Sequence, residues 1–211
     1  MFNIPTDKER ILFGGPAEGV DFFLKCDGVE MVPVISRAKI SDIPERFLIF
    51  NSPKRFESPE KTGLHSFDHG PKNMSALTRP LTWIHKFIGF KCVVSPDSYM
   101  NRSLAPWQRA RNTVLARAAG ATWQARGLTV IPSIRWTGED DYELVSSGIE
   151  KGSVFAVTAD DTINDGFGRK EFEKGLLAMI DLIQPEGVIV YKPITDAFEA
   201  KIASKTRIFT F

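Results

Sequence analysis

Five short apolar runs constrain the fold of this chain most strongly. They span residues 47–50, 90–94, 128–134, 153–158 and 187–191. Each run is apolar without alternation and ends where polar residues begin, which is typical of strands covered on both faces, as in a parallel sheet. Residues 62–68 form a further, weaker strand candidate.

Helical segments separate these runs. Residues 104–126 carry apolar side chains at spacings of three and four, with Pro106 in the first turn and Gly127 just past the end. Gly120 within this segment predicts a kink or a break, because glycine costs about 1 kcal/mol against alanine in a helix. Residues 169–183 form a second clear amphipathic helix, and weaker candidates lie at 75–88, 139–147 and 195–204.

Strands that alternate with helices form βαβ units, which wind right-handed. The sequence therefore predicts an α/β fold with a mostly parallel sheet, either open and doubly wound or barrel-like and incomplete. A complete eightfold barrel typically needs about 250 residues, and this chain has 211. We expect residues 1–211 to form a single α/β domain, with an irregular N-terminal segment over 1–40.

Charge and composition narrow the classes of partner. The chain has 27 basic and 26 acidic residues, a balance that argues against a strongly basic nucleic-acid-binding surface. No apolar run approaches the roughly 20 residues of a membrane span, and the N-terminus lacks a signal-peptide layout, so the cytoplasm is the expected compartment. Cys26 and Cys92 form no C-x-x-C pair, and Cys92 reads as a buried, inert thiol.

The strand ends supply the candidate site, because ligands bind outside the carboxyl ends of parallel strands. Asp97 follows one strand and is the candidate catalytic base, with Asp68 as a second candidate; an Asx-turn or helix cap is the alternative for Asp97. Arg135 and Lys192 are candidate anion contacts, and Trp136 is a candidate stacking wall; a salt bridge and a packed indole are the alternatives.

Two further patterns bear on metals and nucleic acids. His65, Asp68 and His69 have the spacing of a metal pair on a helix, but the surrounding sequence is not helical and no third ligand is evident, so no metal site is predicted. The segment 102–126 is basic and includes Trp107 and Trp123, which suits a phosphate backbone if exposed, or core packing with a solvated face. No nucleotide-binding or hydrolase motif is present, so the cofactor is unknown.

The central part of the chain carries a series of motifs. They are Ser95-Pro96-Asp97-Ser98 followed by Arg102, Trp123-Gln124 followed by Gly127-Leu128 and Val130 to Ile134, Gly152-Ser153-Val154, and Phe172 followed by Gly175-Leu176. In order and spacing these motifs resemble the family called domain of unknown function 4417. The resemblance implies an intracellular α/β protein of bacteria, phages or other mobile genetic elements, and the family has no assigned reaction. The matching polar positions that could contact a ligand are Asp97, Asn112, Gln124, Trp136 and Thr158. Members of the family usually have a pair of acidic residues at the strand end near position 68, whereas this chain has Asp68 alone.

Three functional hypotheses follow from these observations. The first is an enzyme or binding protein for a phosphorylated or nucleotide-like ligand at the strand ends. The second is a nucleic-acid-binding accessory protein of a phage or mobile element that uses the basic face of 102–126. The third is a host-interaction protein without a small-molecule site, which predicts a flat surface with an exposed apolar patch.

Overall fold

The computed structural model describes residues 24–28, 31–50, 58–67, 71–159 and 166–211. The strands are β1 (Cys26–Asp27), β2 (Val32–Pro33), β3 (Arg46–Ile49), β4 (Thr62–His65), β5 (Cys92–Val94), β6 (Val130–Ile131), β7 (Phe155–Thr158), β8 (Gly187–Tyr191) and β9 (Arg207–Thr210). The helices are α2 (Pro71–Thr78), α3 (Ile84–Phe87), α4 (Pro106–Ala125), α5 (Tyr142–Ser146), α6 (Gly166–Ile183) and α7 (Asp196–Ala203), and short 3-10 turns include Pro80–Trp83 and Glu139–Asp141.

The long strands form two parallel sheets. The first has the order β3-β4-β5-β6 and the second has the order β7-β8-β9, so the strands of each sheet follow one another along the chain. A parallel bridge between Ser133 and Ala156 joins the two sheets just beyond β6. The carboxyl ends of these strands therefore meet at one edge of the molecule.

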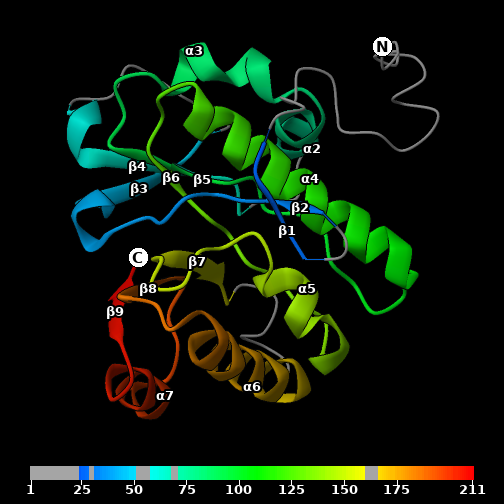
Figure 1. Cartoon of the computed structure of the whole chain (residues 1–211). Coiled ribbons are helices and arrows are strands. Elements are labelled where there is room, and N and C mark those ends of the chain that lie inside the picture. Colours follow the sequence, from blue (N-terminus) through cyan, green and yellow to red (C-terminus); the bar gives the residue numbers. More distant parts are fainter. Residues whose placement is uncertain (1–23, 29–30, 51–57, 68–70, 160–165) are drawn as a thin grey trace.

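Helices cover the outer faces of both sheets, and apolar side chains fill the inner faces. In Figure 1, α2, α3 and α4 lie above the first sheet, while α6 and α7 lie below the second. One helical core gathers Trp83, Phe87 and Trp123 against the first sheet. The inner faces of both sheets share a further core, to which each of the seven strands or the residues flanking them contribute: Phe47, Phe67, Cys92, Ile131, Ala156, Ile189 and Phe209.

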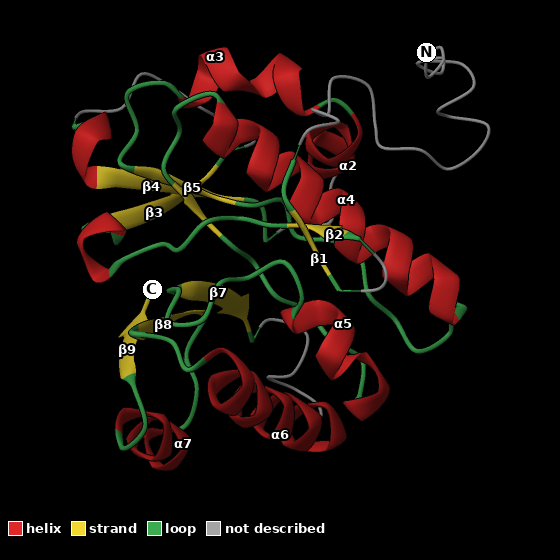
Figure 2. Cartoon of the chain, in the orientation of Figure 1, coloured by secondary structure: helices red, strands yellow, loops and turns green. Residues whose placement is uncertain are grey.

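The structure confirms a mixed α/β fold with a parallel sheet of four strands and does not confirm a doubly wound arrangement. Within the described ranges the strands do not close into a barrel, because β3 and β9 each remain a sheet edge. The five predicted apolar runs and the weaker 62–68 candidate each overlap a strand. Figure 2 shows the strands in yellow. Strand β9 was not predicted, because its short sequence Arg207–Thr210 is only half-buried and carries a polar residue at each end.

The predicted break at Gly120 is wrong. Helix α4 continues without interruption from Pro106 to Ala125. A Cβ atom at Gly120 would lie 2.5 Å from the Cδ1 atom of Ile35, so this glycine allows the extended N-terminal segment to approach the helix closely. Gly120 allows the helix to pack closely against the segment that contains Ile35. Helix propensity alone does not indicate such a tertiary contact.

Both cysteines are free thiols, and burial raises the pKa of the Cys92 thiol, as expected for an inert core residue. No helix in the described part of the chain is both long enough and apolar enough to cross a membrane.

Candidate functional site

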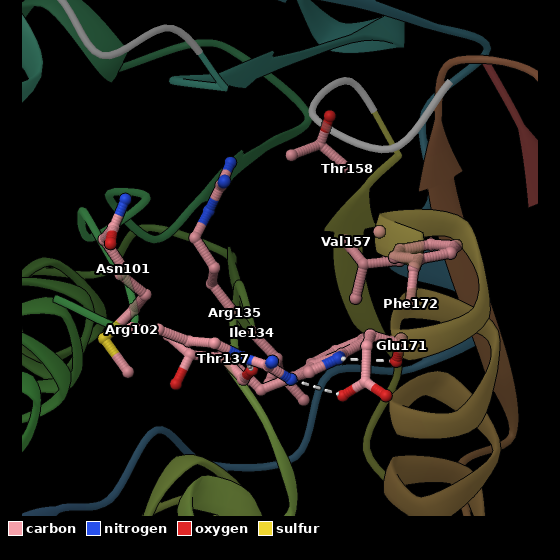
Figure 3. Close-up of a pocket in the computed structure, with 12 residues that line it drawn as sticks. Asn101, Arg102, Ile134, Arg135, Thr137, Val157, Thr158, Glu171 and Phe172 are labelled. Carbon is pink, nitrogen blue, oxygen red and sulfur yellow. Dashed lines mark hydrogen bonds and ion pairs between the residues drawn. The ribbon is translucent and has the colours of Figure 1, made fainter. Parts of the chain in front are cut away.

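A cavity of about 340 Å³ opens at the carboxyl ends of β6 and β7, beside the first turns of α6. Its size lies within the roughly 300–1,000 Å³ of typical ligand pockets. Figure 3 shows the lining side chains, which come from the segment after β5, from the ends of β6 and β7 and from α6. They are Met100, Asn101, Arg102, Ile134, Arg135, Trp136, Thr137, Val157, Thr158, Gly168, Glu171 and Phe172.

Asp97 and Arg135 meet at this edge in a two-point ion pair. The Arg135 Nε–H donates to Asp97 Oδ1 over 3.1 Å, and Nη2 donates to Oδ2 over 2.7 Å. The Asp97 side chain is 1% exposed and that of Arg135 is 13% exposed. This planar contact between guanidinium and carboxylate fixes the direction in which the Arg135 side chain extends.

The Asp97 backbone is anchored to neighbouring elements. Its N–H donates to the Ser66 hydroxyl over 2.9 Å, and its carbonyl accepts from the Asn73 amide over 2.5 Å. Ser66 follows β4 and Asn73 lies on α2, so Asp97, which follows β5, links the end of β4 and helix α2 to Arg135. The backbone at Asp97 is thus held by hydrogen bonds on both sides.

A second arginine forms the opposite wall of the cavity. Arg102 donates from Nε to the Thr137 carbonyl and from Nη2 to Glu171 Oε2, both over 2.7 Å. The Asp141 carboxylate accepts from the Thr137 N–H over 3.0 Å and from Arg109 Nε over 2.7 Å. These contacts hold the loop after β6 against α4 and α6, and they place Thr137 at the rim.

Trp136 is both a cavity wall and a packing residue. Its indole stacks on Phe172 with ring centroids 5.7 Å apart, and its Nε1–H donates to the Glu171 carbonyl over 3.3 Å. A Cβ atom at Gly175 would overlap the indole, so the absence of a side chain there makes room for Trp136 on α6. Trp136 is therefore a packed indole, which was the structural alternative, and it also borders the cavity.

Lys192 lies at the end of β8, beside a buried histidine. Its backbone has φ +76°, a left-handed conformation that is uncommon for a residue other than glycine. Its ammonium group lies 5.3 Å from the centre of the Tyr191 ring, which itself contacts His65 at 4.3 Å. Burial, with a smaller contribution from the charge of Lys192, lowers the pKa of His65 to about 4, so its imidazole is neutral at pH 7.

The structure brings some predicted site residues together and separates others. Arg135, Trp136 and Thr158 line the cavity, and Asp97 contacts Arg135. Asn112 donates to the Tyr99 carbonyl over 2.7 Å, beside the loop that supplies Arg102. Asp68 lies outside the described residues.

Gln124 lies at the C-terminal end of α4, whereas the cavity lies beyond the ends of the strands that α4 connects. Its side-chain amide accepts from the Ser36 N–H over 2.8 Å and donates to the Ser36 carbonyl over 3.1 Å. This pair of hydrogen bonds holds the N-terminal extended segment against the helix and explains the residue without a ligand.

The basic segment 102–126 is largely committed to internal contacts. Arg102 and Arg109 form the ion pairs described above with Glu171 and Asp141. Trp123 is fully buried and Trp107 is 66% exposed. A basic face that could contact a phosphate backbone is therefore interrupted, and Trp123 fits the alternative of core packing.

Arg117 on the same helix is buried at 2% exposure. Its guanidinium donates to the carbonyls of Ser133, Val145 and Ser147 over 2.7, 2.6 and 3.2 Å. Burial lowers the pKa of Arg117 to about 9, which still leaves the group charged at pH 7. The residue stabilises the segment after β6 and the end of α5.

Among the described residues, no group of three histidine, cysteine, aspartate or glutamate side chains is placed to hold a metal ion. His65 points into the aromatic cluster, and its Nδ1 accepts from the Phe67 N–H over 3.2 Å. The other two members of the histidine–aspartate motif, Asp68 and His69, lie outside the described residues.

Three residues that shape the cavity were not predicted as site residues. Arg102 and Phe172 lie in segments that carry the family resemblance, which was the one available signal. Glu171 has no such signal, because it is a partly exposed helical carboxylate. The packing of α6 against the end of β6 brings it to the site.

The profile of one protein family, described as domain of unknown function (DUF4417), matches residues 24–210. The chain belongs to this family. The resemblance predicted from the motifs is thereby confirmed, and it extends over both sheets.

Two curated relatives of this DUF4417 chain are phage proteins. Each is named Gene 1 protein; one is from Mycobacterium phage L5, at 24% identity over 151 residues, and one is from Mycobacterium phage D29, at 22% identity over 151 residues. The match covers 71% of this chain in both cases, and 66% and 56% of the two relatives. The chain thus spans less than two thirds of their length. No solved structure matches it.

Proposed function

We propose that this DUF4417 protein binds a small phosphorylated or nucleotide-like ligand in the cavity at the ends of β6 and β7. The observation that carries the proposal is the Arg135 side chain, which lines a cavity of about 340 Å³ and whose guanidinium is held by the buried Asp97 carboxylate. The following residue, Trp136, lines the same cavity. Guanidinium groups recognise phosphate oxygens through paired N–H donors, and an indole offers a face to a planar ring.

Recognition in this cavity depends on directed donors more than on excess charge. Arg135 is paired with Asp97 and Arg102 with Glu171, so the two arginines are largely neutralised by carboxylates. Thr137, Thr158 and Asn101 add hydroxyl and amide groups to the lining. Because screening acts on net charge, we expect ligand affinity to depend weakly on salt.

Asp97 serves this site as a positioning residue in our proposal. Both of its carboxylate oxygens accept from Arg135, and its side chain is buried, so the carboxylate is directed at the guanidinium. Lys192, at the neighbouring end of β8, is the second proposed anion contact, and its left-handed backbone conformation supports a role beyond packing.

We also propose that the two sheets form one incomplete barrel. The bridge between Ser133 and Ala156 joins them, and their inner faces share a core. The ring centroids of Phe47, on β3, and Phe211, just after β9, are 4.9 Å apart. In such an arrangement the cavity lies at the carboxyl rim, where barrel enzymes bind their ligands.

Calorimetric titration with adenosine monophosphate, inorganic phosphate and adenosine tests the binding proposal. We expect adenosine monophosphate to bind more tightly than either part. Arg135→Lys keeps the charge but loses the planar guanidinium that Asp97 holds in place, and it should weaken adenosine monophosphate binding by about tenfold or more. Arg111→Lys, on an exposed position of α4, is the matched control and should leave affinity unchanged.

The proposal fails if the wild-type protein binds neither phosphate compound, or if both substitutions change the affinity equally. A steep loss of adenosine monophosphate affinity with salt would contradict recognition by directed donors, because salt screens interactions that depend on excess charge.

A further inference from the structure

A second cavity of about 190 Å³ lies at the same edge, beside the ends of β7 and β8 and between α6 and α7. Ala159 follows β7, and Pro193 and Ile194 follow β8. The second cavity therefore occupies the next position along the edge after the cavity at β6 and β7.

The ring of Phe172 separates the two cavities and contributes to the lining of both. It stacks on Trp136 of the first cavity, and its centroid lies 6.4 Å from that of Phe198, edge to face, in the second. Glu171 borders the first cavity and Glu173 the second. The two spaces are thus neighbours across one aromatic side chain.

The second cavity has a different chemistry from the first. Five of its eight lining residues are apolar, namely Ala159, Phe172, Pro193, Ile194 and Phe198, and the other three, Arg169, Glu173 and Thr195, are polar. An apolar cavity of about 150 Å³ is large enough to bind benzene. A space of 190 Å³ is therefore large enough for one ring.

We infer that the second cavity is a binding subsite for a neutral, apolar group of about the size of a benzene ring. Burial of such a group against Ile194 and Phe198 removes apolar surface from water, which is the main source of affinity for an uncharged ring. The inference rests on the proposed function, which places a ligand at this edge of the sheets, but it concerns a part of the ligand that carries no charge.

Fluorine NMR with fluorobenzene tests the subsite directly. We expect saturable binding to the wild-type protein, with nuclear Overhauser contacts from the probe to Ile194 and Phe198. Ile194→Phe fills the cavity and should lower the affinity for fluorobenzene by about tenfold or more. Leu182→Phe adds the same ring at an exposed position near the C-terminal end of α6 and should leave the affinity unchanged.

Three results would overturn the inference: no saturable binding to the wild-type protein, probe contacts confined to the first cavity, or equal losses in the two phenylalanine variants. The Overhauser contacts are measured on the wild-type protein, so they decide the matter even if Ile194→Phe does not fold. Arg135→Lys should leave fluorobenzene binding unchanged, so this test and that of phosphate binding can fail independently.

Discussion

Replacing Asp97 with asparagine tests how firmly the Arg135 guanidinium is held. The substitution keeps the size of the side chain but removes its charge and turns one acceptor into a donor. The native contacts are 3.1 Å at Oδ1 and 2.7 Å at Oδ2, and the carboxylate is 1% exposed. The variant therefore leaves a largely buried cation facing an amide.

The expected cost follows from the burial of the pair. Removing one partner of a buried ion pair costs about 3–5 kcal/mol. Because the Arg135 side chain is 13% exposed and retains some water, we expect the lower end, about 3 kcal/mol, for Asp97→Asn. Replacing both partners, with Arg135→Met, leaves no unpaired charge and should cost about 1 kcal/mol, which gives a coupling energy of at least about 2 kcal/mol.

Urea denaturation of the wild-type protein, the two single variants and the double variant measures this coupling. The exposed pair of Lys61 and Glu45, with Nζ and Oε1 3.0 Å apart, is the matched control. Exposed pairs couple by well under about 1 kcal/mol. A coupling for Asp97 and Arg135 no larger than that of the control pair would refute the view that the carboxylate fixes the guanidinium.

Three further predictions concern stability. The folded-state pKa of His65, about 4, lies below its unfolded value of 6.5, so stability should fall by about 2 kcal/mol between pH 7 and pH 5. In urea denaturation at both pH values His65→Asn should remove that loss, since asparagine keeps an acceptor for the Phe67 N–H; an unchanged pH dependence would exclude His65 as its source. Gly175→Ala should displace Trp136, shift its fluorescence and lower stability by about 1–3 kcal/mol; unaltered fluorescence would show that the indole is not confined there. Arg117→Lys replaces three guanidinium nitrogens, each of which donates to a different carbonyl, by a single nitrogen, so it should lower the free energy of unfolding by about 3 kcal/mol in urea denaturation; a cost under about 0.5 kcal/mol would contradict the structural role.

The sequence predicted the strands more reliably than the way they assemble. A buried parallel strand such as Val188–Val190 is recognisable because both of its faces are apolar. An edge strand such as β9 is half-buried and has too few apolar residues to be distinguished from a loop. The order of the strands in each sheet depends on how the helices pack against them, and a short stretch of sequence does not indicate that packing.

The strand-end rule predicted Arg135 and Trp136, because both follow a recognisable apolar run, and the resemblance to the family predicted Thr158. It did not predict Glu171, which reaches the site from a helix, and it did not indicate that Asp97 would contact Arg135. For Gln124, the resemblance to a family favoured a ligand role, whereas the structure shows hydrogen bonds to Ser36. Similarity of position alone does not separate packing from binding.

Proton–nitrogen NMR of the tryptophan indoles during titration with adenosine monophosphate tests the central claim most directly. The chain has four tryptophans, and Trp136 alone among them lines the described cavity, while Trp107 is 66% exposed on α4. We predict that the Trp136 signal shifts and saturates while the Trp107 signal stays fixed. A shift at Trp107 without one at Trp136, or no shift at either, would contradict a ligand site at the ends of β6 and β7.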